Sequence, residues 1–270
     1  MLLSLMPITC GRMPLVALLT DYGLLDHYVG VVKAVIKRAC SSVDVIDITH
    51  HVTPFNVQEG AFLLLKSVGY LPDGCVIMAV VDPGVATRRK AIAVVTKKRA
   101  MVGPDNGLLF PAAELEGIQS IYEISSSSYV LARPGTFAGR DVFAPAAAHL
   151  ACGLPAWKLG RRLKGMKSLR LPTPRVEREK LHGTVMHVDH FGNLVTNVDA
   201  KTFDGWRQGR TEFILRGRDF SGMVYLRSSY QEMRGTSLIV GSGGEVEISR
   251  RERAPGLPLS LGDGFTLSFV

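Results

Sequence analysis

The sequence lacks long apolar runs and the signatures of several large enzyme classes. None of its apolar stretches reaches the roughly 18 residues that a membrane-spanning helix requires, which excludes a membrane protein. It contains no GxxxxGKS/T, HExxH or GxSxG pattern and no complete GxGxxG after a strand-like segment. These absences argue against a P-loop nucleotide site, a zinc protease, a serine esterase and a dinucleotide-binding fold.

Cysteine is scarce and carries no ligand spacing. The 4 cysteines are spread along the chain without a CxxC pair: Cys10, Cys40, Cys75 and Cys152. This spread favours a reduced, cytoplasmic protein with inert buried thiols over one with a disulfide. The histidines at 50, 51, 187 and 190 also lack metal-ligand spacing, so we expect no metal and no cofactor. Residues 1–13 lack the features of a signal peptide, and we expect them to form a loose extension.

Basic residues exceed acidic ones, with 32 Lys and Arg against 24 Asp and Glu and a formal net charge of +8. Such an excess raises the question of an anionic partner such as nucleic acid. The basic residues concentrate in segment 158–178, which also holds glycine and proline but no interleaved aromatic residues for base stacking. We therefore interpret this segment as a solvated linker and expect no nucleic-acid partner.

Strand-like and helix-like segments alternate in the first half of the chain, which is typical of parallel βαβ units. Strands are expected at 15–19, 43–48, 75–81, 91–95 and 100–102, and helices at 26–38, 58–68 and 143–150. The second half carries short strands between turns, at 182–198, 211–215, 237–240, 244–248 and 264–270. The predicted fold class is α/β: an N-terminal α/β domain with a mostly parallel sheet (13–157), a linker (158–180) and a smaller all-β, barrel-like domain (181–270).

Acidic residues follow several of the predicted strands. They are Asp21, Asp47, Asp82 and Asp105. Aspartate before glycine or proline is ordinary turn chemistry, which explains any one of them alone. Because ligands bind beyond the carboxyl ends of parallel strands, the recurrence favours a polar cleft at that edge of the sheet.

Unusual local sequence is concentrated in three blocks: VVDPGVATRR (80–89), PDNGLL (104–109) and TFAGRDVFAP (136–145). A buried carboxylate beside an arginine can hold and polarise a small nucleophile such as water. The same pair can also be a structural contact that fixes a turn, and spacing alone does not separate these interpretations.

These blocks, with TDYGLLDHYVG, VIDITHHVTPFNVQEGA, VDHFGNLVTNV and GSGGEVEIS, resemble in order the S-adenosylmethionine hydroxide adenosyltransferases. These adenosine-forming hydrolases are related to the fluorinase and the chlorinase. The resemblance covers nearly the whole chain and implies an N-terminal α/β domain and a C-terminal barrel-like domain. It also implies a homotrimer that binds substrate between the N-domain of one subunit and the C-domain of the next.

The resemblance further implies hydrolysis of S-adenosyl-L-methionine to adenosine and L-methionine by an Asp–Arg–His triad that positions a water. The first two members fall on Asp82 and Arg89, and Ala138 stands at the position of the family histidine. Either this alanine is natural and a neighbouring group or a second water compensates, or it is an engineered His→Ala exchange, which the fit of the adjoining residues favours. We expect weakened hydrolysis. Ala86 stands where the family usually has glycine.

Substrate contacts carry over by position. In the N-domain, Asp21 would hold the ribose hydroxyls, Asp26 and Tyr28 the methionine end, and Phe55 the adenosyl group. In the neighbouring subunit's C-domain, the methionine and adenine pockets would be completed by Asp189, Asn193, Tyr230, Ser242 and Glu247.

Two other functions compete with hydrolysis. Halogenating relatives carry a tyrosine where this chain has Asp82, and a carboxylate facing the nucleophile would repel a halide ion, so halide-dependent cleavage is disfavoured. A protein that binds S-adenosylmethionine or adenosine with little turnover is favoured by Ala138.

Overall fold

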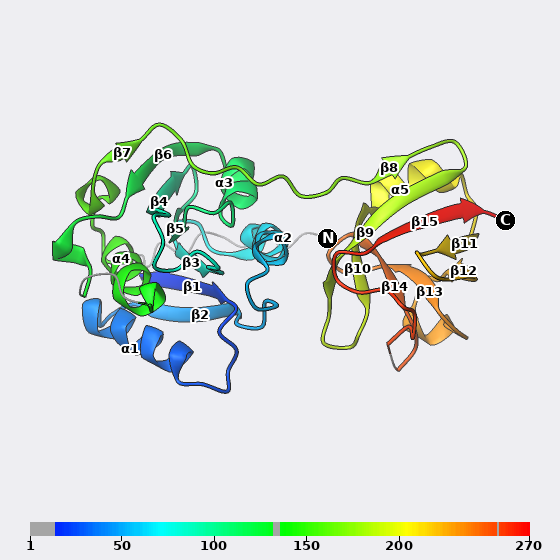
Figure 1. Cartoon of the computed structure of the whole chain (residues 1–270), viewed down its shortest axis with the longest axis horizontal. Helices are drawn as coiled ribbons and strands as arrows, with labels where there is room; N and C mark the ends of the chain where they lie inside the picture. Colours follow the sequence, from blue (N-terminus) through cyan, green and yellow to red (C-terminus); the bar gives the residue numbers. More distant parts are fainter. Residues whose placement is uncertain (1–13, 132–135, 253) are drawn as a thin grey trace, which may run out of the picture. The chain divides into compact units, whose positions relative to one another are not determined.

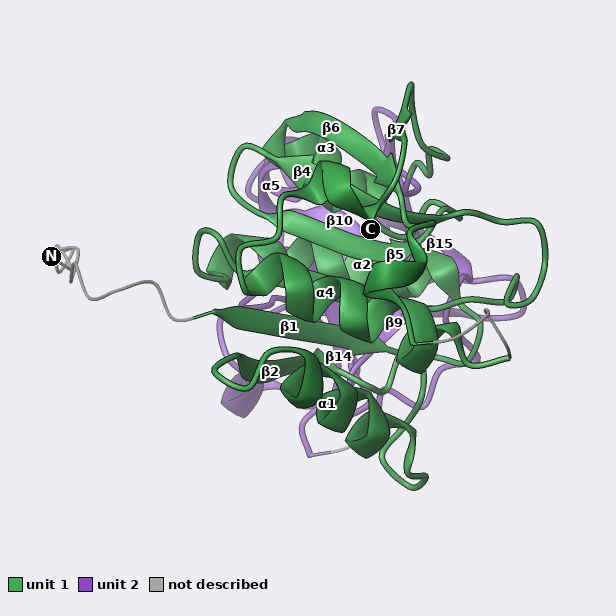
Figure 2. Cartoon of the chain, turned by 90° about the vertical axis from the view of Figure 1, so that its left-hand side faces the viewer, with its two compact units in different colours: residues 1–170 green, residues 171–270 purple. Residues whose placement is uncertain are grey.

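The computed structural model describes residues 14–131, 136–252 and 254–270, so the expected N-terminal extension lies outside the described residues. The chain divides into two compact units, residues 1–170 and 171–270 (Figure 2). The segment predicted as a linker contains two short strands, β7 (Arg162–Leu163) and β8 (Arg175–Val176), which pair with strands of unit 1 and unit 2 respectively. No helix in the described part of the chain has the length and apolar character needed to cross a membrane.

Unit 1 is built on a seven-stranded sheet with the order β2-β1-β3-β5-β4-β6-β7 (Figure 1). Its strands are β1 (Leu15–Thr20), β2 (Asp44–Thr49), β3 (Val76–Val80), β4 (Ala91–Thr96), β5 (Ala100–Pro104), β6 (Ile118–Glu123) and β7. The first four strands of this order are parallel, as predicted, and β4, β6 and β7 are antiparallel. The antiparallel part follows from chain length, because the three residues between β4 and β5 are too few for a parallel crossover.

Helices cover the parallel strands. Helix α1 (Tyr28–Ala39) buries Val29, Val32 and Ile36 at helical spacing. It packs with α4 (Ala144–Ala151) in one core cluster with β1 and β3. Helices α2 (Val57–Ser67) and α3 (Phe110–Glu116) contact each other, and they also contact β1 and β4 respectively. Single turns complete the unit at Val68–Tyr70 (η1), Ser127–Tyr129 (η2), Gly139–Phe143 (η3, a π-helical turn) and Ala156–Leu159 (η4).

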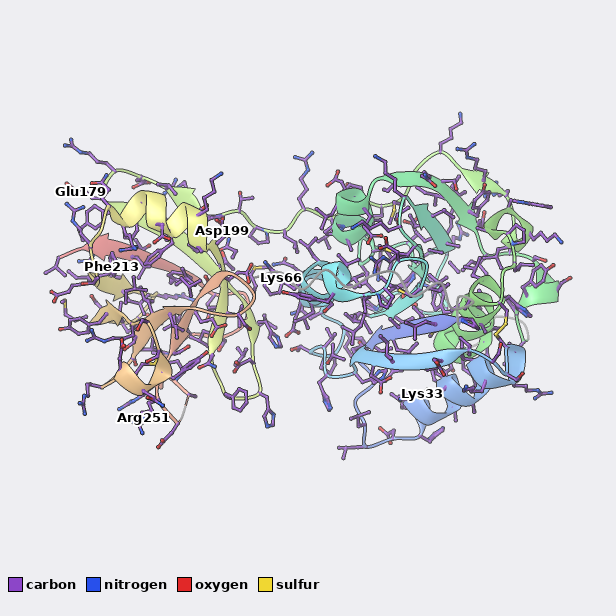
Figure 3. All side chains as sticks on the ribbon, turned by 180° about the vertical axis from the view of Figure 1, so that it is seen from behind. Lys33, Lys66, Glu179, Asp199, Phe213 and Arg251 are labelled. Atoms are coloured by element: carbon purple, nitrogen blue, oxygen red, sulfur yellow. A yellow bond between two sulfur atoms is a disulfide. The ribbon has the colours of Figure 1, made fainter. Side chains whose placement is uncertain are left out.

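A disulfide joins Cys40 to Cys152, which corrects the expectation that these cysteines are free thiols (Figure 3). Cys40 is the C-cap residue of α1, and Cys152 is the C-cap residue of α4. Because the two helices pack together, their ends bring the sulfur atoms within bonding reach across 112 residues of sequence. Cys75 is a buried free thiol, and Cys10 lies outside the described residues.

Unit 2 is a closed β-barrel. Its strands are β9 (Lys180–Val188), β10 (Leu194–Asp199), β11 (Glu212–Arg216), β12 (Ser221–Leu226), β13 (Ser237–Val240), β14 (Glu245–Ser249) and β15 (Gly264–Phe269), with β8 added beside β9. Strand β9 pairs with both β15 and β10, which closes the barrel. The pairings are antiparallel except for β12 with β13.

Three features of unit 2 differ from the sequence prediction. The strand expected at 182–198 is two strands, β9 and β10, with a turn between them, and β12 was missed. The unit also contains a helix, α5 (Ala200–Arg207), and a single turn, η5 (Tyr230–Glu232). Helix α5 buries Phe203 and Trp206 against Phe213 of the barrel core, which explains why so short a segment is helical.

Candidate active site

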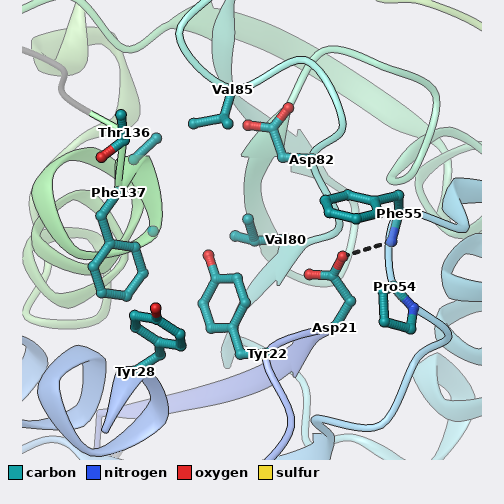
Figure 4. A pocket seen from close by; sticks show the side chains of 12 residues that line it. Asp21, Tyr22, Tyr28, Pro54, Phe55, Val80, Asp82, Val85, Thr136 and Phe137 are labelled. Atoms are coloured by element: carbon teal, nitrogen blue, oxygen red, sulfur yellow. Dashed lines mark hydrogen bonds between the residues drawn. The ribbon is translucent and has the colours of Figure 1, made fainter. Parts of the chain in front are cut away.

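A pocket of about 250 Å³ lies in unit 1 at the carboxyl ends of β1 and β3 (Figure 4). Asp21 directly follows β1, and Asp82 follows β3 by two residues. Because these strands are parallel neighbours, their ends meet at one edge of the sheet. The pocket is lined by Asp21, Tyr22, Tyr28, Pro54, Phe55, Val80, Asp82, Val85, Thr136, Phe137, Ala138 and Gly139.

Asp82 is held by Arg89 through three hydrogen bonds. Arg89 Nε donates to Asp82 Oδ1 at 3.0 Å and to Oδ2 at 2.8 Å, and Arg89 Nη2 donates to Oδ2. The two side chains are only 6% and 15% exposed, and the guanidinium also lies 5.2 Å from the ring centroid of Phe143. This paired geometry fixes the orientation of the carboxylate in the pocket. Oδ1 accepts one of these bonds and retains the capacity to accept another from a bound water.

Asp21 shapes the neighbouring wall of the pocket. Its Oδ2 accepts a hydrogen bond from the backbone N–H of Phe55 at 2.9 Å. Phe55 adopts a left-handed backbone, with φ of 66°, and its exposed ring lines the pocket. Burial raises the pKa of the Asp21 carboxyl, with a smaller contribution from the charge of Asp82. The pocket therefore holds two carboxylates that both favour a cationic ligand.

The segment that presents Phe55 is fixed by the start of α2. The side chain of Asn56 accepts a hydrogen bond from the backbone N–H of Glu59 at 3.0 Å. The Glu59 side chain in turn accepts one from the backbone N–H of Thr53 at 2.8 Å. The first bond caps the helix, and the second ties the preceding loop to the first turn of α2.

The wall opposite Phe55 is aromatic. The rings of Tyr22, Tyr28 and Phe137 meet edge to face, with centroid separations of 5.3 to 6.3 Å. Ala138, at the position of the family histidine, is buried and contributes only its methyl group to the pocket. Gly139 begins the π-helical turn, and a Cβ atom placed there would lie 2.2 Å from the hydroxyl of Tyr22.

The other acidic candidates of unit 1 lie elsewhere. Asp26 is exposed and is not among the pocket residues. Asp47 lies within β2, where it pairs with Lys33 at 2.6 Å and with His50 at 3.1 Å. Asp105 accepts a hydrogen bond from the backbone N–H of Lys167 at 2.6 Å, which is a structural contact between distant segments of unit 1.

Unit 2 contains a second pocket, of about 780 Å³, which includes all five predicted contacts of the barrel domain. It is lined by Asp189, Phe191, Asn193, Tyr230, Gln231, Ile239, Val240, Gly241, Ser242, Glu247, Arg250, Arg251 and Glu252. Asp189 serves mainly to shape its own loop, since it accepts hydrogen bonds from the backbone of Phe191 and from the backbone and side chain of Asn193.

Glu247 is the central polar group of this second pocket. Tyr230 donates a hydrogen bond from its hydroxyl to Glu247 Oε2 at 2.9 Å. Burial raises the pKa of Glu247, with the charge of Asp189 adding to the shift, and burial with the Glu247 contact raises the pKa of Tyr230 to about 12. A Cβ atom at Gly241 would lie 1.8 Å from Glu247 Oε1, so this carboxyl position depends on glycine at 241.

Several pocket residues were missed by the sequence reasoning. Tyr22 and Phe137 stand directly beside the predicted residues Asp21 and Ala138, and that adjacency was the available signal. Phe191 lies between the predicted residues Asp189 and Asn193 in the block VDHFGNLVTNV, and Gln231 directly follows Tyr230.

Comparisons with known proteins agree across both units. Residues 16–160 match the SAM hydroxide adenosyltransferase N-terminal domain, and residues 183–254 match the corresponding C-terminal domain. A (R)-S-adenosyl-L-methionine hydrolase of Salinispora arenicola is 45% identical over 67% of this chain and 70% of its own length. The hydrolase of the same name from Thermus thermophilus is 41% identical over 93% of this chain and 98% of its own length. A crystal structure of an uncharacterized conserved protein from Thermotoga maritima has a TM-score of 0.88 and 36% identity, covering 94% of this chain and 100% of that chain.

Proposed function

The chain belongs to the SAM hydroxide adenosyltransferase family, and from this premise we propose that it hydrolyses S-adenosyl-L-methionine to adenosine and L-methionine. The observation that carries the proposal is Asp82, held by Arg89 at the pocket beside a second carboxylate, Asp21.

In this reaction a water oxygen forms a bond to C5′ of the adenosyl group while the C5′–sulfur bond breaks. The bonding electron pair leaves with sulfur, which gives neutral methionine thioether, and the water loses one proton to give the 5′-hydroxyl of adenosine. The sulfonium is already a good leaving group, so the main requirement is an aligned water. Asp82 supplies an oriented acceptor for a water hydrogen, and Arg89 keeps that acceptor in place.

Charge supports the same substrate. S-adenosylmethionine carries a positive sulfonium, and the pocket of unit 1 presents Asp21 and Asp82 to it. The same carboxylates disfavour a halide ion as nucleophile. A ribose bound at Asp21 can donate its hydroxyl hydrogens to the carboxylate, and the Phe55 ring offers an apolar surface for the adenosyl group.

The remaining substrate-binding residues are assigned in both units and across subunits. We assign Asp26 and Tyr28 to the methionine end, and Asp189, Asn193, Tyr230, Ser242 and Glu247 to the pockets contributed by a neighbouring subunit of a homotrimer. Support comes from the presence in each unit of a pocket whose lining includes carboxylates. We also propose the domain limits expected from the sequence, which are 13–157 and 181–270 with a linker between them.

A cytoplasmic location completes the proposal, and the disulfide makes it testable. Disulfides are rare in cytosolic proteins of mesophiles, so the redox state of the Cys40–Cys152 pair inside cells bears on the location. Alkylation of the thiols at the moment of lysis, followed by mass spectrometry, would measure this. A fully oxidised pair in rapidly quenched cells would contradict the location.

Hydrolysis is tested by incubating the protein with S-adenosylmethionine and following adenosine and methionine by chromatography. We expect Asp82→Asn to lower the rate by about 10²- to 10⁴-fold, while Asp44→Asn, an exposed aspartate on strand β2, leaves it unchanged. Ala138→His should raise the rate. Hydrolysis is contradicted if both the unaltered chain and Ala138→His bind S-adenosylmethionine and neither forms adenosine. Chloride-dependent formation of 5′-chloro-5′-deoxyadenosine would indicate halide transfer instead.

A further inference from the structure

Tyr22 brings a phenolic hydroxyl to the part of the pocket where Ala138 offers none. Its ring packs against Phe137 at a centroid separation of 5.6 Å, and the hydroxyl lies so close to Gly139 that only a residue without Cβ fits there. Figure 4 shows this hydroxyl pointing into the pocket, on the side of Val80 and Asp82. Ala138, which directly precedes Gly139, has only an apolar methyl group as its side chain.

The Tyr22 hydroxyl has no hydrogen-bond partner among the residues that the structure describes, although other pocket polar groups do. Asp82 is bonded to Arg89, and Asp21 is bonded to the backbone of Phe55. Tyr22 is partly buried and lines the pocket, so the partner of its hydroxyl is expected among the molecules that enter the pocket. Those molecules are the substrate and the water that attacks it.

Tyr22 keeps its proton throughout the physiological pH range. Burial raises the pKa of its phenol well above the ordinary value of 10.0, and the charges of Asp21 and Asp82 raise it further. A neutral phenol oxygen accepts a hydrogen bond as well as donating one. The group is therefore suited to orienting a water and unsuited to removing its proton.

We propose that the Tyr22 hydroxyl orients the attacking water in place of the absent imidazole, an inference that rests on the proposed hydrolysis. The water donates one hydrogen to Asp82 Oδ1 and the other to the Tyr22 oxygen, which leaves a lone pair directed at C5′. The C5′–oxygen bond then forms as the C5′–sulfur bond breaks, and the released proton leaves by way of Asp82 to solvent. Ala138 is in this case a natural residue, and the hydrogen bond that an imidazole would make is supplied by Tyr22 in the loop after β1.

Tyr22→Phe tests the inference because it removes only the hydroxyl. We expect kcat to fall by about 10- to 100-fold, the size of effect that a misplaced nucleophile produces, with KM for S-adenosylmethionine changed by less than about threefold. Tyr129→Phe is the matched control, since Tyr129 packs on the same core cluster but is not a pocket residue, and its kcat should be unchanged. Thermal unfolding of both variants separates this effect from a loss of folding.

The same substitution in the Ala138→His background gives the sharper readout. An imidazole at 138 should supply the hydrogen bond that Tyr22 otherwise provides, so Tyr22→Phe should then cost less than about threefold in kcat. A merely structural role of Tyr22 predicts equal losses in both backgrounds.

Each outcome bears on a different claim. Equal kcat for the unaltered chain and Tyr22→Phe would overturn the role of Tyr22 and leave hydrolysis standing. Adenosine formed only by Ala138→His, and not by the unaltered chain, would likewise overturn the role of Tyr22. Absence of adenosine from both proteins would overturn the proposed hydrolysis and the Tyr22 inference together.

Discussion

Ala86 has a left-handed backbone, with φ of 62°, in the turn that connects Asp82 to Arg89. This conformation favours glycine, the residue that the family usually carries there. It costs other residues about 1–2 kcal/mol, whereas glycine loses about 0.5–1 kcal/mol more than alanine in conformational entropy on folding. The alanine therefore introduces backbone strain beside the proposed catalytic pair, Asp82 and Arg89.

Ala86→Gly should raise the free energy of unfolding by about 0.5–1 kcal/mol, measured by urea denaturation. Ala200→Gly serves as the comparison, since Ala200 begins helix α5 with an ordinary backbone and should lose stability on the same exchange. Equal effects of the two substitutions would show that the backbone at Ala86 carries no strain.

The ionisation of Asp21 should be visible in the pH dependence of hydrolysis. Because burial raises its pKa above 3.8, the carboxylate gains its proton at a higher pH than an exposed aspartate does. As pH falls through that raised pKa, the charge that faces the cationic substrate is lost, so kcat/KM should decrease. Asp21→Asn should remove or displace this acid limb and lower kcat/KM at neutral pH.

Glu247→Gln is the necessary comparison in that experiment, because burial also raises the pKa of Glu247. The limb assigned to Asp21 should persist in Glu247→Gln. An acid limb that is unchanged in Asp21→Asn and absent in Glu247→Gln would reassign the titration to unit 2.

At the scale of elements, the disulfide ties the C-terminal end of α1 to that of α4. It closes a loop of 112 residues, for which the chain-entropy account gives about 4–5 kcal/mol of stabilisation and measured cases about 2–5 kcal/mol. Cys152→Ser should lower the free energy of unfolding by an amount in this range. A reducing agent should destabilise the unaltered chain similarly and leave Cys152→Ser unaffected; destabilisation of both would indicate another target of the reductant.

Elements with a local signal were predictable, and those that depend on distant packing were not. Helices α1 and α2 carry apolar residues at helical spacing, and both were predicted within one or two residues of their bounds. Helix α5 is eight residues long and contains Gly205, so its pattern was too short to be recognised. The disulfide was missed because Cys40 and Cys152 meet only through the packing of two helices.

The candidate site also contains residues that a local sequence pattern predicts and residues that it does not. Asp21 and Asp82 were identified because each lies in a recognisable block after a strand, and the parallel sheet brings them to one pocket. The pairing of Tyr22 with Gly139 was not predictable, because no local pattern indicates which loop will pack against the π-helical turn.

At the scale of the whole molecule, the proposed homotrimer with sites shared between subunits predicts complementation between inactive subunits. Asp82→Asn disables the pocket of unit 1, and Tyr230→Ala is expected to disable that of unit 2. Mixed after reversible dissociation, the two inactive proteins should recover about one quarter of normal activity, because a site that joins two subunits can combine intact halves. No recovery in mixed trimers confirmed by native mass spectrometry would place each site within one subunit.

The strand order β2-β1-β3 has a consequence for how this chemistry can change over evolution. From β1 the chain departs to one side to form β2 and returns on the other side as β3, so the loops after β1 and β3 diverge at a topological switch point. The opening between them is a product of connectivity, and neither loop contributes a strand to the sheet. Residues in segments 21–27 and 81–90 can therefore be substituted during evolution, and such substitutions can change the preferred nucleophile. The sheet that supports the two loops need not change.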